Sequence, residues 1–379
     1  NVALDHNQLT MEILKKVAEK HGMACLLHEK PFAGVNGSGK HTNWSISTDT
    51  GINFLSPGKN PEDNKLFLLT LAAIVQAVDD YQDLLRVSVA SAGNDHRLGG
   101  HEAPPAIISM FIGTELEDIV ESIVSGKKLE KHNPLKMQFT ATALPSFQQD
   151  NTDRNRTSPF AFSGNKFEFR MTGSDMSIGD VCFVLNTIVA ESMEQFADEL
   201  EKAEDFDTAL DQLIKKVFTE HQRIIFNGDN YTDKWVAEAE KRGLLNLTST
   251  VEAAQYMIAK KNIDLFEHHG ILTEVESIAR YRIKLDEYSK IINIEALTMI
   301  DMAKRGIAPA VSAYCSDLAG AALSKKELGV SVKAETEVLS KISDLAGVLN
   351  DKIAALENTV LKADEFEDAE QAKYFRDTV

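Results

Sequence analysis

HEKPFAGVNGSGKHTNWSIST, residues 28–48, consists of a charged turn, a glycine-dense loop and a stretch of alternating polar and apolar residues. Its three glycines allow positive φ angles and a close approach to a ligand, which a Cβ hinders. The spacing of Gly34, Gly39 and Lys40 matches the start of a phosphate-binding P-loop, which then requires Ser or Thr and a helix. Here His41 follows, and alternating polar and apolar residues predict a strand. The P-loop interpretation fails, and the loop instead delivers an imidazole, a good ligand for a divalent metal.

A second dense stretch, residues 86–105, reads RVSVASAGNDHRLGGHEAPP. RVSVA predicts a strand, and small and charged residues follow it. Gly99 and Gly100 form a hinge pair between Arg97 and Glu102, a pattern that suits a mobile flap closing over a site. The alternative is a long loop with solvated charges.

A third dense stretch, residues 153–171, reads DRNRTSPFAFSGNKFEFRM. Residues 165–171 alternate as a strand, which places Lys166, Glu168 and Arg170 on one face and phenylalanines on the other. A carboxylate flanked by two cations suits a metal ligand among phosphate and carboxylate binders. Solvated polarity on a strand face is the alternative.

Composition limits the class of protein. The chain has 379 residues, 43% of them apolar, so it can bury a large core in two or three units. A net charge of −18 argues against nucleic acid or an anionic membrane as the main partner. No apolar run is long enough for a membrane span. Three scattered cysteines form no metal spacing and no even disulfide set, which indicates a reducing, cytoplasmic compartment.

Periodicity predicts the remaining elements. Helices are expected at residues 5–19, 65–77, 103–111 and 114–125, and a short buried strand at 23–27. From Met176 onward the chain reads as almost wholly helical. Apolar positions between 333 and 362 are typical of helix pairing.

In this order, the three dense stretches resemble the catalytic domain of glutamine synthetase, specifically its long type III branch. Asn36-Gly-Ser-Gly-Lys-His41 is similar to that family's glycine loop with its metal histidine, and Arg97-Leu-Gly-Gly-His-Glu102 to its flap. Asn155-Arg-Thr-Ser-Pro-Phe-Ala-Phe and Lys166-Phe-Glu-Phe-Arg170 resemble its nucleotide- and glutamate-binding strands.

The resemblance implies a role for each matching residue. The divalent metal that bridges the ATP phosphates would be held by His41 and Glu168. Substrate glutamate would be bound by Asn36, Gly37, Arg97 and Glu102, with Arg170 near its γ-carboxylate. The nucleotide would lie along Asn43, Trp44 and Ser45. Of the two catalytic residues, Arg156 would neutralise phosphate charge, and Glu102 would close the site and take a proton from ammonium.

The resemblance also implies an activity: an ATP-dependent ligase that forms glutamine from glutamate and ammonia through γ-glutamyl phosphate, with Mg²⁺ or Mn²⁺. Such enzymes serve glutamine biosynthesis and nitrogen metabolism and form large homo-oligomeric rings that share sites between subunits. The expected fold is α+β, a curved antiparallel sheet packed by helices. Residues 1–175 would be the C-terminal part of the catalytic domain, and residues 176–379 a helical C-terminal region with helix-pairing segments.

Two departures from the family pattern qualify the resemblance. The family has a further arginine shortly after the Arg156 position, where this chain reads Pro159-Phe-Ala-Phe162. The family's N-terminal domain and its metal-binding strand glutamates would precede residue 1, so the chain alone is expected to bind metal poorly and be inactive. The alternatives are a γ-glutamyl amide ligase or guanidino kinase of the same fold, and a non-catalytic paralogue acting in assembly.

Overall fold

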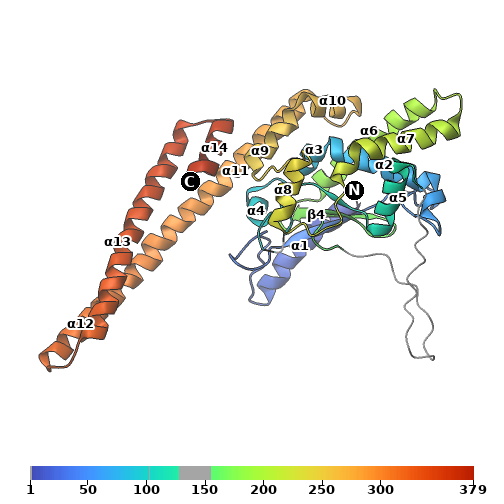
Figure 1. The fold of residues 1–379 in the computed structure, drawn as a ribbon. Coiled ribbons are helices and arrows are strands. Elements are labelled where there is room, and N and C mark those ends of the chain that lie inside the picture. Colours follow the sequence, from blue (N-terminus) through green and yellow to red (C-terminus); the bar gives the residue numbers. More distant parts are fainter. Residues whose placement is uncertain (1, 102, 128–154) are drawn as a thin grey trace, which may run out of the picture. The chain divides into compact units, whose positions relative to one another are not determined.

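The computed structural model describes residues 2–101, 103–127 and 155–379. Two compact units make up the chain, Asn1–Ile278 and Ala279–Val379 (Figure 1). The domain boundary predicted at residue 175 stays a prediction. Within the described ranges, no helix has both the length and the apolar composition to cross a membrane.

The first unit contains a four-stranded sheet in the order β1-β4-β3-β2. Strands β1 (Gly39–Trp44), β4 (Phe167–Gly173) and β3 (Phe160–Phe162) pair antiparallel, whereas β2 (Met110–Phe111) joins β3 in parallel. The predicted α+β class is confirmed, and the parallel β2 makes the sheet mixed.

Phenylalanines hold this sheet to the helices. Phe160 stacks on Phe167 with ring centroids 4.6 Å apart and meets Phe169 edge-on at 5.8 Å. On the helix side, Phe67 of α2 (Lys65–Asp80) approaches Phe162 of β3 at 5.9 Å. The predicted apolar face of β4 is therefore confirmed as core.

Helices α6 (Gly179–Leu200) and α7 (Phe206–His221) both pack against the apolar α2. At one end of this packing, Asp79 of α2 accepts from His221 Nδ1 at 2.9 Å and from Arg223 Nε at 2.8 Å. The other helices of this unit are α1 (Val2–Lys20), α3 (Gln82–Val87), α4 (Ala92–Arg97), α5 (Thr114–Ser125), α8 (Asp233–Lys241), α9 (Thr250–Ala254) and α10 (Lys260–His268).

Helix α1 confirms the helix predicted at residues 5–19, yet none of its residues is buried. The side chains of Leu9, Ile13 and Val17 are 57%, 48% and 48% exposed. An apolar stripe of this kind is typical of a surface that another segment or subunit covers.

Three local predictions are wrong. Residues 23–27 form no strand, because Met23 and Leu26 remain exposed and Met23 N donates to the Ala18 carbonyl at 2.9 Å, a bond that closes the end of α1. The RVSVA segment continues α3 into a turn. Residues 103–109 are irregular and lead into β2, because Pro104 and Pro105 disfavour a helix there.

The second unit consists of long helices. Most of α11 (Glu274–Met302) belongs to this unit, and a π-helical turn, Ala303–Ile307, connects it to α12 (Ala308–Glu327). Helix α13 (Lys333–Lys362) packs against α12. Ile300 and Ala303 form a small core with Ile353 of α13, which confirms the predicted helix pairing. At the C-terminus, α14 (Asp368–Thr378) is tied back by the Tyr374 hydroxyl, which donates to the Thr359 carbonyl at 3.1 Å.

Candidate functional site

His41 and Glu168 meet across the pairing of β1 and β4. Asn43 lies opposite Glu168, and the register shifts between Lys40 and Thr42, at His41. His41 is therefore the diagonal neighbour of Glu168 across the two strands, and diagonal neighbours lie on the same face of a sheet. The irregular register at His41 also changes the direction of its side chain, which reaches Glu168. The two side chains lie with His41 Nδ1 2.9 Å from Glu168 Oε1. His41 is half exposed, whereas Glu168 is buried.

Arg170 lies two residues further along the same face of β4. Its Nη2 and Nε donate to Glu168 Oε2 at 2.6 and 3.1 Å, and both side chains are 6% exposed. The solvated alternative is therefore wrong for Glu168 and Arg170, whereas Lys166, which precedes β4, is exposed as that alternative expected. Burial alone would raise the pKa of the Glu168 carboxyl, but Arg170, and then His41, outweigh it and hold the pKa below its usual value.

The third dense stretch reaches this cluster through Arg170, whose Nη1 donates to the Asn155 carbonyl and, at 3.4 Å, to the Ser158 carbonyl. Asn155 itself donates to the Gly228 carbonyl at 2.7 Å. Between these anchored residues, Arg156 is exposed. The backbone beside the ion pair is thus fixed while one guanidinium remains in solvent.

Arg97 packs against the backbone of β4, and its side chain is buried, at 7% exposed. Its guanidinium donates to the carbonyls of Arg170 and Met171 at 2.9 and 3.1 Å, and to Asn94 Oδ1 at 3.1 Å. Burial lowers the pKa of Arg97, opposed mainly by the charge of Glu29. In this arrangement, Arg97 binds the protein's own backbone.

The predicted flap is more ordered at its start than a loop would be. Residues Ala92–Arg97 form α4, with Ser91 capping Asn94 N at 3.2 Å, and Asn94 fully buried. Neither is this part a loop with solvated charges, since Asp95 pairs with buried Arg86 at 2.8 Å. Glu102, the predicted closing acid, lies outside the described residues.

The glycine loop needs its glycines for a different reason than predicted. Of the three, only Gly34 has a positive φ, +76°. A Cβ on Gly37 would lie 2.8 Å from Arg97 Cγ, and one on Gly39 would lie 2.4 Å from Arg97 Nη2. The loop therefore packs directly on the Arg97 side chain, and Asn36 stands beside Gly37 at the exposed surface.

Glu29 is a buried carboxylate that sequence reasoning missed. It is 3% exposed, its Oε1 accepts from Asp175 N at 3.0 Å, and its carbonyl accepts from Ser38 N at 2.7 Å. A Cβ on Gly173 would lie 2.3 Å from the same Oε1. In the sequence, the only sign of a role for Glu29 was its position just before the glycine loop, and that position gave no reason to expect a buried carboxylate.

The predicted nucleotide residues divide between two faces. Asn43 is exposed with His41 on one face of β1, and exposed Ser45 follows the strand. Trp44 points to the other face, where its Nε1 donates to Asn186 Oδ1 on α6 at 2.9 Å. Their roles in nucleotide binding stay predictions.

The residues present fit a divalent cation as part of a ligand set. His41 and Glu168 bring one imidazole nitrogen and one carboxylate oxygen within 2.9 Å at the edge of solvent. A carboxylate whose pKa is lowered stays ionised and available as a ligand. Mg²⁺ and Mn²⁺ take about six ligands, so two donors alone would hold such an ion weakly.

Comparison with known proteins gives two family models that match separate parts of the chain. The model described as the glutamine synthetase catalytic domain matches residues 2–108. The model described as the glutamine synthetase C-terminal domain matches residues 209–326.

Similar proteins include a glutamine synthetase of Butyrivibrio fibrisolvens, 45% identical over 100% of this chain and 55% of that protein. A type-3 glutamine synthetase of Dictyostelium discoideum is 48% identical over 84% of this chain and 44% of that protein. A glutamine synthetase of Bacteroides fragilis is 39% identical over 90% of this chain and 47% of that protein. The chain thus spans about half the length of these curated relatives.

Proposed function

We propose that this chain, which belongs to the glutamine synthetase family, forms part of an ATP-dependent ligase that makes glutamine from glutamate and ammonia. The observation that carries the proposal is the ion-paired cluster of His41, Glu168 and Arg170 on one sheet face. The similarity to the Dictyostelium type-3 relative supports the type III branch.

The chemistry of the proposed reaction explains these residue types. The glutamate γ-carboxylate attacks the γ-phosphorus of ATP, ADP leaves, and ammonia displaces phosphate from γ-glutamyl phosphate. Negative charge grows on oxygen in both steps, and fixed cations stabilise it. We assign Arg156 to this task because it is exposed beside the anchored cluster. Glu102 would exclude water and accept the ammonium proton.

The cofactors of the proposal are ATP and Mg²⁺ or Mn²⁺. His41 and Glu168 would hold the divalent ion, which when bound neutralises charge on the phosphates. Arg170 keeps Glu168 ionised and oriented. Asn36 and Gly37 would bind substrate glutamate, with Arg170 near its γ-carboxylate. Arg97 would join them once its guanidinium turns from the Arg170 and Met171 carbonyls, to which it donates in this structure. The packing of Gly37 on Arg97 supports placing these two together.

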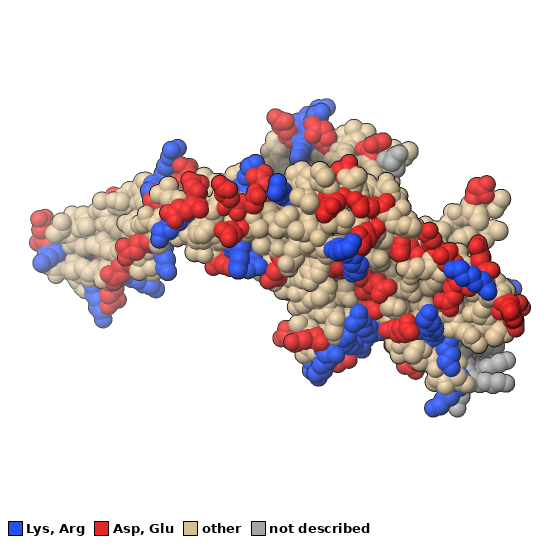
Figure 2. All heavy atoms as spheres, turned by 90° about the horizontal axis from the view of Figure 1, so that it is seen from above, with Lys and Arg blue, Asp and Glu red and all other residues tan. Residues whose placement is uncertain are grey.

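The proposed partners are the small-molecule substrates and further copies of the chain in a ring. The exposed apolar stripe of α1 and exposed side chains such as Leu328, at 80%, support assembly. On the face shown in Figure 2, the described Lys and Arg side chains are interspersed with Asp and Glu. This mixture supports the proposal that nucleic acid is no partner. Cytoplasmic localisation stays a prediction.

Joining this chain to the part of the Butyrivibrio relative that it does not match tests the function. We expect the joined protein, with ATP, Mg²⁺, glutamate and ammonia, to form glutamine and inorganic phosphate, and the chain alone to form neither, because two protein donors bind the ion weakly. Folding of both proteins is verified by circular dichroism.

A matched control supplies glutamate and ATP with hydroxylamine in place of ammonia, so that γ-glutamyl hydroxamate, ADP and phosphate form by acyl transfer to a better nucleophile. Glutamine formation by the chain alone would show that these 379 residues complete the metal site. A joined protein that is folded and inactive in both assays would contradict the proposed function.

A further inference from the structure

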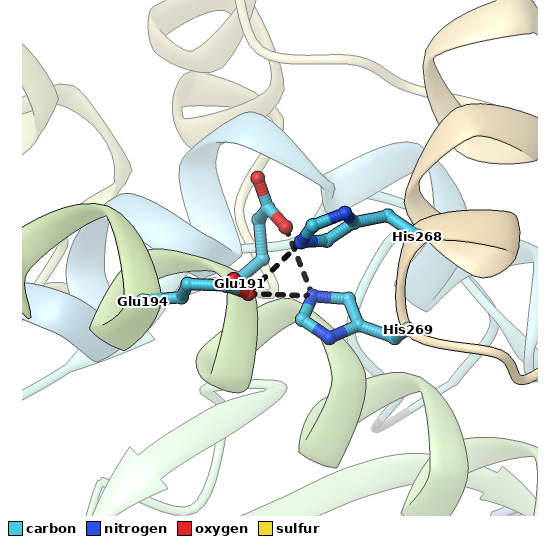
Figure 3. A group of neighbouring side chains, drawn as sticks. All are labelled: Glu191, Glu194, His268 and His269. Carbon is cyan, nitrogen blue, oxygen red and sulfur yellow. Dashed lines mark hydrogen bonds and ion pairs between the residues drawn. The ribbon is translucent and has the colours of Figure 1, made fainter. Parts of the chain in front are cut away.

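Four side chains that the proposed ligase does not use converge where α6 meets α10 (Figure 3). Glu191 and Glu194 lie one turn apart on α6, which places them on one helix face. His268 ends α10 and His269 follows it directly. Figure 3 shows both imidazoles pointing at the two carboxylates from the opposite side.

The distances are close to those of a tetrahedral metal site. His268 Nε2 lies 3.0 Å from Glu194 Oε2, and His269 Nε2 lies 2.9 Å from Glu191 Oε2 and 4.0 Å from Glu194 Oε2. One ligand atom from each residue lies within 4.8 Å of all the others. Bonds of about 2.0–2.2 Å to Zn²⁺ place tetrahedral ligand atoms about 3.3–3.6 Å apart. Small side-chain movements would therefore admit the ion.

A second set of hydrogen bonds orients one of the ligands. Glu191 Oε1, the oxygen that faces away from His269, accepts from Gln195 Nε2 at 2.8 Å. Gln195 Oε1 in turn accepts from Gln76 Nε2 of α2 at 2.8 Å. Outer hydrogen bonds of this kind fix ligand geometry in metal sites.

The chain contains a second group of possible metal ligands with which this cluster can be compared. Asp79, Asp80 and His221 form another group of possible ligands. There, Arg223 Nε donates to both oxygens of Asp79, at 2.8 and 3.0 Å, so a cation of the protein already occupies that carboxylate. Among the described residues, the contacts of Glu191, Glu194, His268 and His269 include no lysine or arginine.

We propose that Glu191, Glu194, His268 and His269 form a binding site for a zinc-class divalent ion that ties α10 to α6. Two imidazoles and two carboxylates are a donor set that suits Zn²⁺, whereas Mg²⁺ and Ca²⁺ prefer oxygen alone. All four ligands come from the protein, which is typical of a structural site. The bound ion raises the stability of the folded chain, because ligands that bind only the native state stabilise it.

Separate titrations of the chelator-treated, metal-free chain with Zn²⁺ and with Co²⁺ test the site. We expect one tight Zn²⁺ equivalent, a rise in melting temperature with Zn²⁺, and the strong visible absorption of four-coordinate Co²⁺. His268→Ala removes all three. Gln195→Ala, which touches no ligand nitrogen, weakens Zn²⁺ affinity about 10–100-fold. Since His268 is half exposed, its replacement should leave the fold intact.

Two control variants separate this site from the others. The Co²⁺ signal is expected to survive His221→Ala, which alters the arginine-occupied group, and His41→Ala, which alters the proposed catalytic ligand. An equal Zn²⁺ stoichiometry and affinity in wild type and His268→Ala would overturn the proposal, as would a signal lost only in His221→Ala or His41→Ala. Ligase activity enters none of these readouts, so failure here leaves the proposed function standing.

Discussion

Replacing Arg156 by alanine in the joined protein is expected to lower kcat for glutamine formation about 10²–10³-fold, the effect of removing one fixed group that stabilises transition-state charge. Where the family pattern has a further arginine shortly after this position, the chain reads Pro159-Phe-Ala-Phe162. Arg156 would therefore carry more of the phosphate charge.

Because Arg156 is exposed, its replacement should change activity without changing the stability of the fold. An exposed side chain away from the core contributes little to folding, so the melting temperature should stay unchanged. Steady-state kinetics of Arg156→Ala, Arg156→Lys and the nearby exposed Lys166→Ala provide the comparison. We expect partial activity in the lysine variant and full activity in Lys166→Ala. A kcat for Arg156→Ala within twofold of wild type would remove Arg156 from the mechanism.

Replacing Arg170 by methionine is expected to destabilise the chain by about 3–5 kcal/mol, because it leaves Glu168 as a buried charge without its main partner. Urea unfolding monitored by circular dichroism measures the loss. The double variant Glu168→Gln/Arg170→Met should recover part of it, since no buried charge remains. A single-variant loss below about 1 kcal/mol would mean that the pair contributes little.

The pH dependence of this loss has a definite sign. Because the pKa of Glu168 is lowered in the folded chain, the pair contributes stability that is fully present above the unfolded carboxyl's pKa of about 4.3. That contribution is lost as the pH falls through the lowered folded pKa. The stability gap between wild type and Arg170→Met should therefore be widest near neutral pH and narrow in acid.

The sequence predicted the site best where one strand carried the information. Alternation in residues 165–171 placed Glu168 and Arg170 on one face, and the structure confirms that face. The glycine loop predicted His41 at the start of a strand, and β1 begins at Gly39. Long helices with strong periodicity, such as α2, α5 and α13, were also predicted close to their observed bounds.

Properties that depend on the packing of distant segments were not predictable. The buried state of Glu29 depends on the small residues Gly93 and Gly173, far away in sequence. Gly39 leaves room for the Arg97 guanidinium, which packs against it and comes from a distant part of the sequence. RVSVA has β-forming residues, but it continues a helix, from whose end the buried Arg86 donates to Asp95 through Nη2 and to the Leu247 carbonyl through Nε. Both partners lie outside the RVSVA segment, so its local pattern did not indicate them.

The most direct test of the account is whether His41 holds the divalent ion. Electron spin-echo envelope modulation of Mn²⁺ bound to the joined protein detects a directly coordinated imidazole nitrogen. We expect this nitrogen coupling to be present in the wild type, to persist in His268→Ala, and to disappear in His41→Ala. Coupling that persists in His41→Ala and disappears in His268→Ala would place the bound ion elsewhere and contradict the assignment of the catalytic metal to His41 and Glu168.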